Sequence, residues 1–235
     1  MYVGEDERLG EPRKGRQPDV VRILLIDPAG VLSKGKLREE IRSKLEGKFN
    51  RLDPGWLKQA NIRFSVQFRS SEPSKEEKSR FGPLDFPVYF LATQHGEKTV
   101  LDLMTEHKIP NAIKKQDSYD LVKECWVRRD TRGCGIPSGD GFRKIGFIKT
   151  HRVFQDATGD LALAFVNVTS HEIGHMGNRQ QHSKNGLMKY PVPLNVDIDF
   201  DKDDKYLFLG DLQRLRALNQ RRTQTKVQSF QWVFR

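Results

Sequence analysis

The sequence has few cysteines, no long apolar run and no apolar segment at its start. Cys125 and Cys134 are the only cysteines among 235 residues, too few for a disulfide scaffold, although they can pair or stay free thiols. No stretch approaches the roughly 20 apolar residues of a membrane span. Residues 1–19 lack the apolar region of a secretory signal, so we expect an intracellular protein, a mature form or export by a specialised route.

Acidic residues are outnumbered by basic ones. The chain has 41 Lys and Arg against 31 Asp and Glu, a formal net charge of +10. Such a charge attracts acidic partners such as nucleic acid, anionic surfaces or acidic protein segments. The sequence contains no helix-turn-helix pattern, RNP-like segment or basic-aromatic repeat, so a nucleic-acid function would rest on charge alone.

The most specific chemistry lies in residues 166–190, VNVTSHEIGHMGNRQQHSKNGLMKY. His171 and His175 are four residues apart, so on a helix both imidazoles lie on one face and can bind one Zn²⁺. Glu172 adjoins His171, where its carboxylate can reach water at the metal. The largely apolar residues 161–170 precede the motif and predict the helix that carries it.

A third histidine follows the end of this predicted helix. Gly177 and Asn178 are expected to end the helix and turn the chain back. A neutral imidazole binds zinc better than a carboxamide does, so His182 rather than Gln181 or a downstream carboxylate is predicted to complete the site.

This segment resembles the metzincin clan of zinc peptidases, whose pattern HExxHxxGxxH is followed by a turn with a buried methionine. The matching residues here are His171, Glu172, His175, His182 and Met188. The letters HS...GLM.YP are similar to matrix metalloproteinases, and the M-x-Y of Met188 and Tyr190 is similar to astacins and serralysins. Two positions depart from the pattern, because Asn178 replaces a glycine and the third histidine falls one residue late.

The resemblance implies a zinc-dependent endopeptidase that cleaves peptide bonds through a metal-activated water. Three histidines would bind Zn²⁺, and Glu172 would act as general base and pass the proton to the departing amine. Tyr190 would donate a hydrogen bond to the oxyanion or would only pack beside the turn, and Met188 would be structural. The alternatives are a non-catalytic zinc-containing binding protein and a basic module that binds nucleic acid or an anionic surface.

The residues RGCGIPSGD around Cys134 are similar to the PRCGxPD latency motif of matrix metalloproteinases, in which a thiolate occupies the open zinc position. Here the motif lies inside the expected sheet region, which favours a chance similarity of a Gly/Pro turn over latency.

The remaining sequence predicts an α/β fold, a twisted mixed sheet with a backing helix and an active-site helix, as in zincins. Apolar or alternating patterns predict strands at residues 20–26, 61–68, 87–92, 124–129 and 144–154. Helices are predicted at residues 36–49, 99–107 and 209–220, and loops at 69–85 and 130–141. One of the last two strands should form the sheet edge along the cleft, where an extended peptide can add as another strand.

We expect a flexible arm at residues 1–19 and one domain at 20–235, with an upper sheet subdomain (20–177) and a lower subdomain (178–235). The acidic residues 197–204 are expected to form a solvated loop, with Ca²⁺ binding as the alternative. Three further histidines stand alone and are expected to lie at the surface or in hydrogen bonds: His95, His107 and His151.

Overall fold

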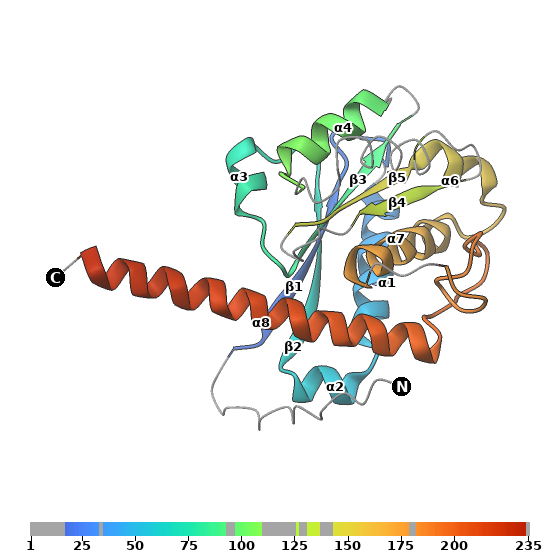
Figure 1. Ribbon diagram of the computed structural model, residues 1–235. Coiled ribbons are helices and arrows are strands. Elements are labelled where there is room, and N and C mark those ends of the chain that lie inside the picture. The colour runs from blue at the N-terminus through green and yellow to red at the C-terminus, as the bar shows by residue number, and fades with distance from the viewer. Residues whose placement is uncertain are drawn as a thin grey trace.

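A mixed sheet of five strands lies at the centre of the computed structural model, which describes residues 17–32, 35–92, 97–109, 126, 131–136, 143–178 and 182–233 (Figure 1). The strands are β1 (Asp19–Ile26), β2 (Ile62–Arg69), β3 (Asp85–Leu91), β4 (Gly133–Ile136) and β5 (Ile145–Lys149). Their order is β2-β1-β3-β5-β4, and every neighbouring pair is parallel except β4 with β5. The predicted α/β class is therefore confirmed.

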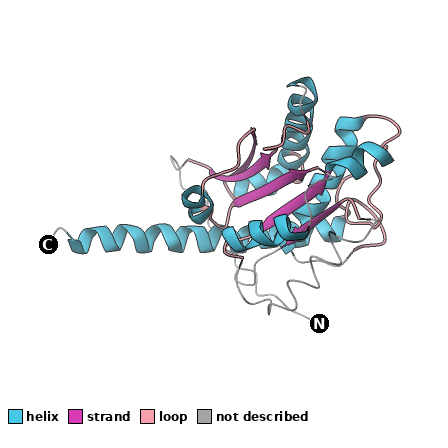
Figure 2. Cartoon of the chain, turned by 90° about the horizontal axis from the view of Figure 1, so that it is seen from above, coloured by secondary structure: helices cyan, strands magenta, loops and turns pink. Residues whose placement is uncertain are grey.

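Helices cover both faces of this sheet (Figures 1 and 2). The described helices are α1 (Gly35–Asn50), α2 (Pro54–Gln59), α3 (Lys75–Arg80), α4 (Glu97–Glu106), α6 (Thr150–Asp156), α7 (Leu161–Asn178) and α8 (Lys202–Val233). None of them is both long and apolar enough to cross a lipid bilayer.

The alternation of side chains along β1 shows how the two layers form. Ile23 and Leu25 point into the larger core, which α1, α7 and α8 complete, whereas Leu24 and Ile26 point into a second core against α4. On α1 the buried residues Ile41, Leu45 and Phe49 recur every four positions, as the sequence predicts. These contacts hold α7 firmly against the sheet.

The structure departs from three predictions for the region before α7. The glycine-rich stretch predicted as a loop at residues 130–141 contains β4, the antiparallel edge strand. Of the strand predicted at 124–129 only Trp126 is described, and its backbone is helical. The last predicted strand is also shorter, because the chain leaves the sheet after Lys149 and enters α6. The glycines suggested a loop, but in β4 Gly133 and Gly135 allow the strand to pack closely against α7.

The C-terminal helix is much longer than the predicted residues 209–220. It begins at Lys202, where Asp201 accepts a hydrogen bond from the Asp204 amide at 2.9 Å, and it runs to Val233. Its first half packs on the core through Phe208 and Leu212, and its C-terminal part extends beyond the rest of the fold (Figures 1 and 2). Of the predicted N-terminal arm, residues 1–16 lie outside the described residues.

A buried lysine binds part of the acidic segment at residues 197–204. Lys48 of α1 is 4% exposed, and its ammonium donates to Asp197 Oδ1, Asp199 Oδ1 and the Ile198 carbonyl. Among the described residues these carboxylates form no grouping with the spacing of metal ligands. The acidic residues therefore tie the segment before α8 to α1.

Candidate metal centre

Helix α7 carries the first two histidines at a defined depth in the fold. Its start is capped by Asp160, whose carboxylate accepts a hydrogen bond from the Leu163 amide at 3.0 Å. Phe165 and Val168 on this helix are fully buried. Because packing fixes the rotation of α7, the side chains one turn apart at 171 and 175 are directed to the same place.

Three imidazoles converge at the end of α7. His171, His175 and His182 each offer a ring nitrogen, and these nitrogens lie within 4.8 Å of one another. The Nε2 atoms of His171 and His175 are 3.1 Å apart. Tetrahedral zinc with Zn–N bonds of about 2.0–2.1 Å would separate two nitrogens by roughly 3.3 Å. The three residues thus fit a divalent ion such as Zn²⁺, which imidazole nitrogen suits.

The tautomer of His171 is set by the chain itself. Its Nδ1 donates a hydrogen bond to the Leu187 carbonyl at 2.8 Å, which leaves Nε2 with a lone pair towards the other two rings. Burial lowers the pKa of His171 to about 3, so the ring is neutral at physiological pH. The neutral imidazole is the form that binds a metal.

His182 reaches the cluster from the segment after α7. Its ring stacks on that of His171 with centroids 5.2 Å apart, and the Tyr190 ring lies 4.7 Å from it on the same segment. The neighbouring Gln181 and the predicted turn after Asn178 lie outside the described residues. Ligation by His182 stays a prediction, and its place beside the other two rings is what that prediction requires.

Met188 packs directly beneath the motif. Its side chain is fully buried, and a β-carbon added at Gly174 would lie 2.4 Å from its sulfur. The glycine within HEIGH is therefore required so that the methionine turn can approach α7. The structural role predicted for Met188 agrees with this burial.

Glu172 lies under the edge strand β4. Its side chain is 5% exposed, and its carboxylate accepts a hydrogen bond from the Gly135 amide. Burial raises the pKa of this carboxyl to about 8, against the opposing effects of the Gly135 amide and the Lys149 ammonium. A β-carbon at Gly133 would lie 2.6 Å from Glu172 Oε1, so the carboxylate fills the space that a side chain there would need.

Cys134 points away from the histidines. Gly133 and Gly135 face α7, so the alternation of a strand directs the Cys134 side chain to the opposite face, where it belongs to the core against α4. It is disulfide-bonded, and the only other cysteine, Cys125, lies outside the described residues. A thiolate of Cys134 is therefore not in place to block a metal at the three histidines.

The other histidines do not join the site. His107 is buried, its Nε2 lies 2.7 Å from the Tyr89 hydroxyl, and burial lowers its pKa to about 3. His151 lies on α6 outside the histidine group found among the described residues, and His95 is not among those residues. The expectation of a hydrogen-bonded histidine is met by His107.

Sequence reasoning missed two contributors to this centre. Lys149 is buried at the end of β5, where its ammonium donates to Thr131 Oγ1 at 2.5 Å and its charge acts on Glu172. The glycines of β4 were read as turn residues, although their alternation in Gly133-Cys134-Gly135 fits a strand facing a close helix. A lysine that ends an apolar strand gives no comparable signal.

The arrangement combines three imidazoles, of which that of His171 is neutral, with the carboxyl of the next residue, which is outside the histidine group. Such a donor set can hold one divalent ion and move a proton beside it. No protein-family model matches the sequence, and no curated protein matches it.

Proposed function

We propose that this protein is a zinc-dependent endopeptidase of metzincin type, with Glu172 as general base. One observation carries the proposal: three imidazole nitrogens within 4.8 Å of one another, with a glutamate next to His171 that is not part of the group. A purely structural zinc site needs no proton acceptor beside it. The peptidase function accounts for both features.

The metal would be held by His171, His175 and His182. When bound, zinc would act as a Lewis acid and lower the pKa of water from 15.7 to about 7. The Leu187 carbonyl keeps His171 Nδ1 protonated and so keeps Nε2 available. In this proposal the Glu172 carboxylate accepts the proton of the attacking water and gives it to the nitrogen of the departing amine.

The Tyr190 hydroxyl is the proposed donor to the substrate carbonyl oxygen as negative charge develops there. Support comes from its ring, which lies 4.7 Å from that of His182. A role limited to packing remains the alternative, and it predicts little effect of removing the hydroxyl.

The substrate is proposed to bind along β4. This strand ends the sheet order and has only β5 as a neighbour, so its other edge is open among the described strands. An extended peptide could pair with that edge and pass over α7, which β4 touches closely at Glu172. The sequence also predicted a peptide-binding sheet edge, but in residues 124–129 or 144–154 rather than in β4.

One observation favours a non-catalytic zinc protein as the second candidate. The Glu172 carboxylate accepts a hydrogen bond from the Gly135 amide and is covered by β4, so it has to become accessible before it can take a proton from water. The basic-module alternative has no comparable structural support.

Cleavage of a quenched peptide library by the zinc-loaded protein tests the proposal. Activity should disappear with a chelator and return with zinc, and Glu172→Gln should lower it by at least roughly 10²–10⁴-fold at matched zinc content. Tyr190→Phe should cost on the order of 10²–10³-fold if the hydroxyl is the oxyanion donor. A Glu172→Gln protein as active as wild type would rule out this mechanism, and zinc binding without hydrolysis would favour the second candidate.

A further inference from the structure

The helix, strands and segment that carry or directly flank the three histidines in the fold hold little negative charge of their own. Helix α7, strands β4 and β5 and residues 182–190 contain Glu172 as their only acidic residue, but three lysines, Lys149, Lys184 and Lys189. Lys149 is buried, whereas Lys184 and Lys189 are exposed. The two exposed lysines lie in the same short segment as His182 and Tyr190.

This segment folds back on itself and so keeps both lysines near the site. The Ser183 amide donates to the Met188 carbonyl at 3.0 Å, and residues Ser183 and Lys189 form a β-bridge. In the sequence Lys189 follows the buried Met188 and precedes the half-buried Tyr190. Met188 is fixed beneath α7 and the Lys189 amide donates to the Gly186 carbonyl at 3.2 Å, so the backbone of the exposed Lys189 is anchored.

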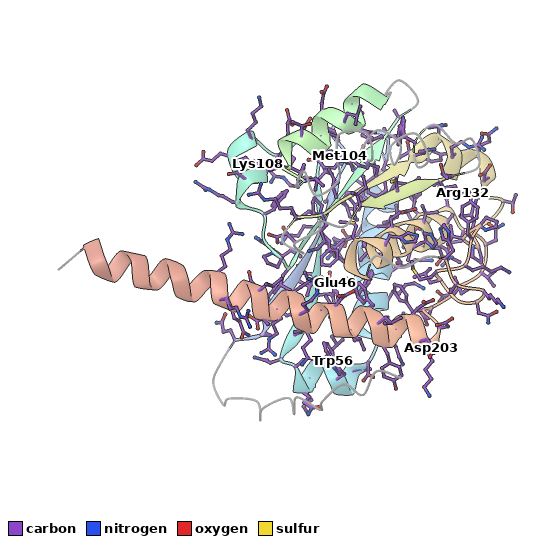
Figure 3. The ribbon with its side chains drawn as sticks, in the orientation of Figure 1. Glu46, Trp56, Met104, Lys108, Arg132 and Asp203 are labelled. Atoms are coloured by element: carbon purple, nitrogen blue, oxygen red, sulfur yellow. The ribbon has the colours of Figure 1, made fainter. Side chains whose placement is uncertain are left out.

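Neither lysine is neutralised by an ion pair within the described residues. Arg132, just before β4, pairs with Asp156 at 2.8 Å, but Lys184 and Lys189 have no carboxylate within ion-pair distance in that part of the chain. Three acidic residues contact this segment. The Asp199 carbonyl accepts a hydrogen bond from the Leu187 amide at 2.9 Å, while its carboxylate accepts one from Lys48. The backbone of Asp201 lies against Gly186, and Asp204 of α8 is buried and hydrogen-bonded to Ser183. In Figure 3 the labelled Arg132 lies above α7 and the labelled Asp203 lies below it.

We propose that this site selects peptides with Asp or Glu close to the bond that is cleaved, and that Lys184 and Lys189 recognise those carboxylates. This inference rests on the proposed peptidase function. Solvent-exposed ammonium groups on the segment that carries His182 attract carboxylates at short range, and the net charge of +10 steers acidic chains towards the protein at longer range. Screening by salt should weaken both effects, since the Debye length is about 8 Å at physiological ionic strength.

The test compares two quenched peptides that differ only by Glu or Gln at the positions flanking the cleaved bond. The wild-type kcat/KM should favour the Glu peptide at low salt, and the preference should shrink as salt rises. Lys184→Glu and Lys189→Glu should each lower the Glu/Gln ratio of kcat/KM by about 2- to 5-fold, the range of an exposed ion pair.

Lys58→Glu is the matched control, because it makes the same change in charge on an exposed residue far from β4. Lys58 lies on α2, which packs against β2 at the opposite edge of the sheet. The Lys58→Glu variant should leave the Glu/Gln ratio of kcat/KM unchanged. An equal fall of the ratio in Lys58→Glu would overturn the assignment to Lys184 and Lys189.

A binding measurement separates this inference from the proposed function. The Glu172→Gln protein is titrated with the labelled Glu and Gln peptides, and the Glu peptide should bind more tightly. Adding Lys184→Glu or Lys189→Glu should reduce this difference in affinity. Preferential binding without hydrolysis by wild type would support acidic recognition and contradict the peptidase. Hydrolysis of both peptides at equal rates would support the peptidase and overturn acidic selection.

Discussion

Gly135 of the edge strand and Glu172 of α7 are in such close contact that a β-carbon at Gly135 would lie 2.1 Å from the main-chain oxygen of Glu172. The Gly135 amide also donates to the Glu172 carboxylate. The position of the proposed general base is thus set by the backbone of β4. Any change that lifts β4 from α7 should disturb Glu172 before it disturbs the rest of the fold.

Gly135→Ala is therefore expected to destabilise the protein by about 1–3 kcal/mol or more, because the strand or the helix has to move. Zinc-dependent activity should fall further than stability alone explains. Gly210→Ala is the control, since a β-carbon there meets nothing within 4 Å on an exposed turn of α8. That variant should gain roughly 0.5–1 kcal/mol, as alanine does over glycine within a helix. Chemical denaturation of both variants measures the difference, and equal stabilities would contradict the close contact.

The motif and the central strands were predictable because their signals are local. Alternating or β-branched apolar residues predicted β1, β2 and β3 closely, and the four-residue spacing of Ile41, Leu45 and Phe49 predicted α1. The edge strand β4 was not predictable in this way. Its glycines satisfy a contact with a helix more than 30 positions later in the chain, and local composition alone reads them as a turn.

The proposed third ligand was predictable only as a residue type. A neutral imidazole was required, and His182 was the candidate, but the one-residue shift from the metzincin pattern could be resolved only by how residues 179–181 run. Those residues lie outside the described structure. The length of α8 was missed because the sequence after Leu215 lacks a clear apolar periodicity, although the backbone continues as a helix to Val233.

Removal of the third imidazole tests the ligand assignment. His182→Ala should weaken zinc binding by more than roughly 100-fold, because loss of a group that only orients a ligand already costs about 10–100-fold. Gln181→Ala should keep the wild-type affinity. Competition with a chromophoric chelator measures both variants. Similar affinities for the two would show that His182 is not a ligand.

Reduction of the disulfide at Cys134 should loosen the edge strand without activating the site. If Cys125 is the partner, the closed loop contributes about 2–3 kcal/mol by chain entropy. A reductant should therefore lower Tm and speed hydrogen exchange of the β4 amides. Cys134→Ser should show the same loss and no further response to the reductant. An increase of peptidase activity in Cys134→Ser would contradict this placement of Cys134 and support the latency alternative.

The pH dependence of stability in the metal-free protein reports on Glu172. Its pKa is raised from 4.5 to about 8, so the folded protein holds a proton that the unfolded chain releases, and stability is lost as pH rises from about 4.5 through 8. The pKa values of His107 and His171 are lowered from 6.5 to about 3, so their stabilisation is present above pH 6.5 and is lost as pH falls towards 3.

Below pH 6.5 the contributions of Glu172 and of the two histidines to stability change in opposite directions with pH. Between pH 6.5 and 8 the ionisation of Glu172 lowers stability as pH rises. The Tm of the metal-free protein should therefore fall across that range. Glu172→Gln should abolish the fall, because an amide has no proton to release, whereas Glu40→Gln on the exposed side of α1 should retain it. Zinc should also reduce the fall in wild type, since a cation at the three histidines favours the ionised carboxylate. Thermal unfolding of the three proteins with a chelator, at intervals between pH 6 and 8.5, provides the measurement. A fall that persists unchanged in Glu172→Gln would show that this carboxyl does not hold its proton under β4.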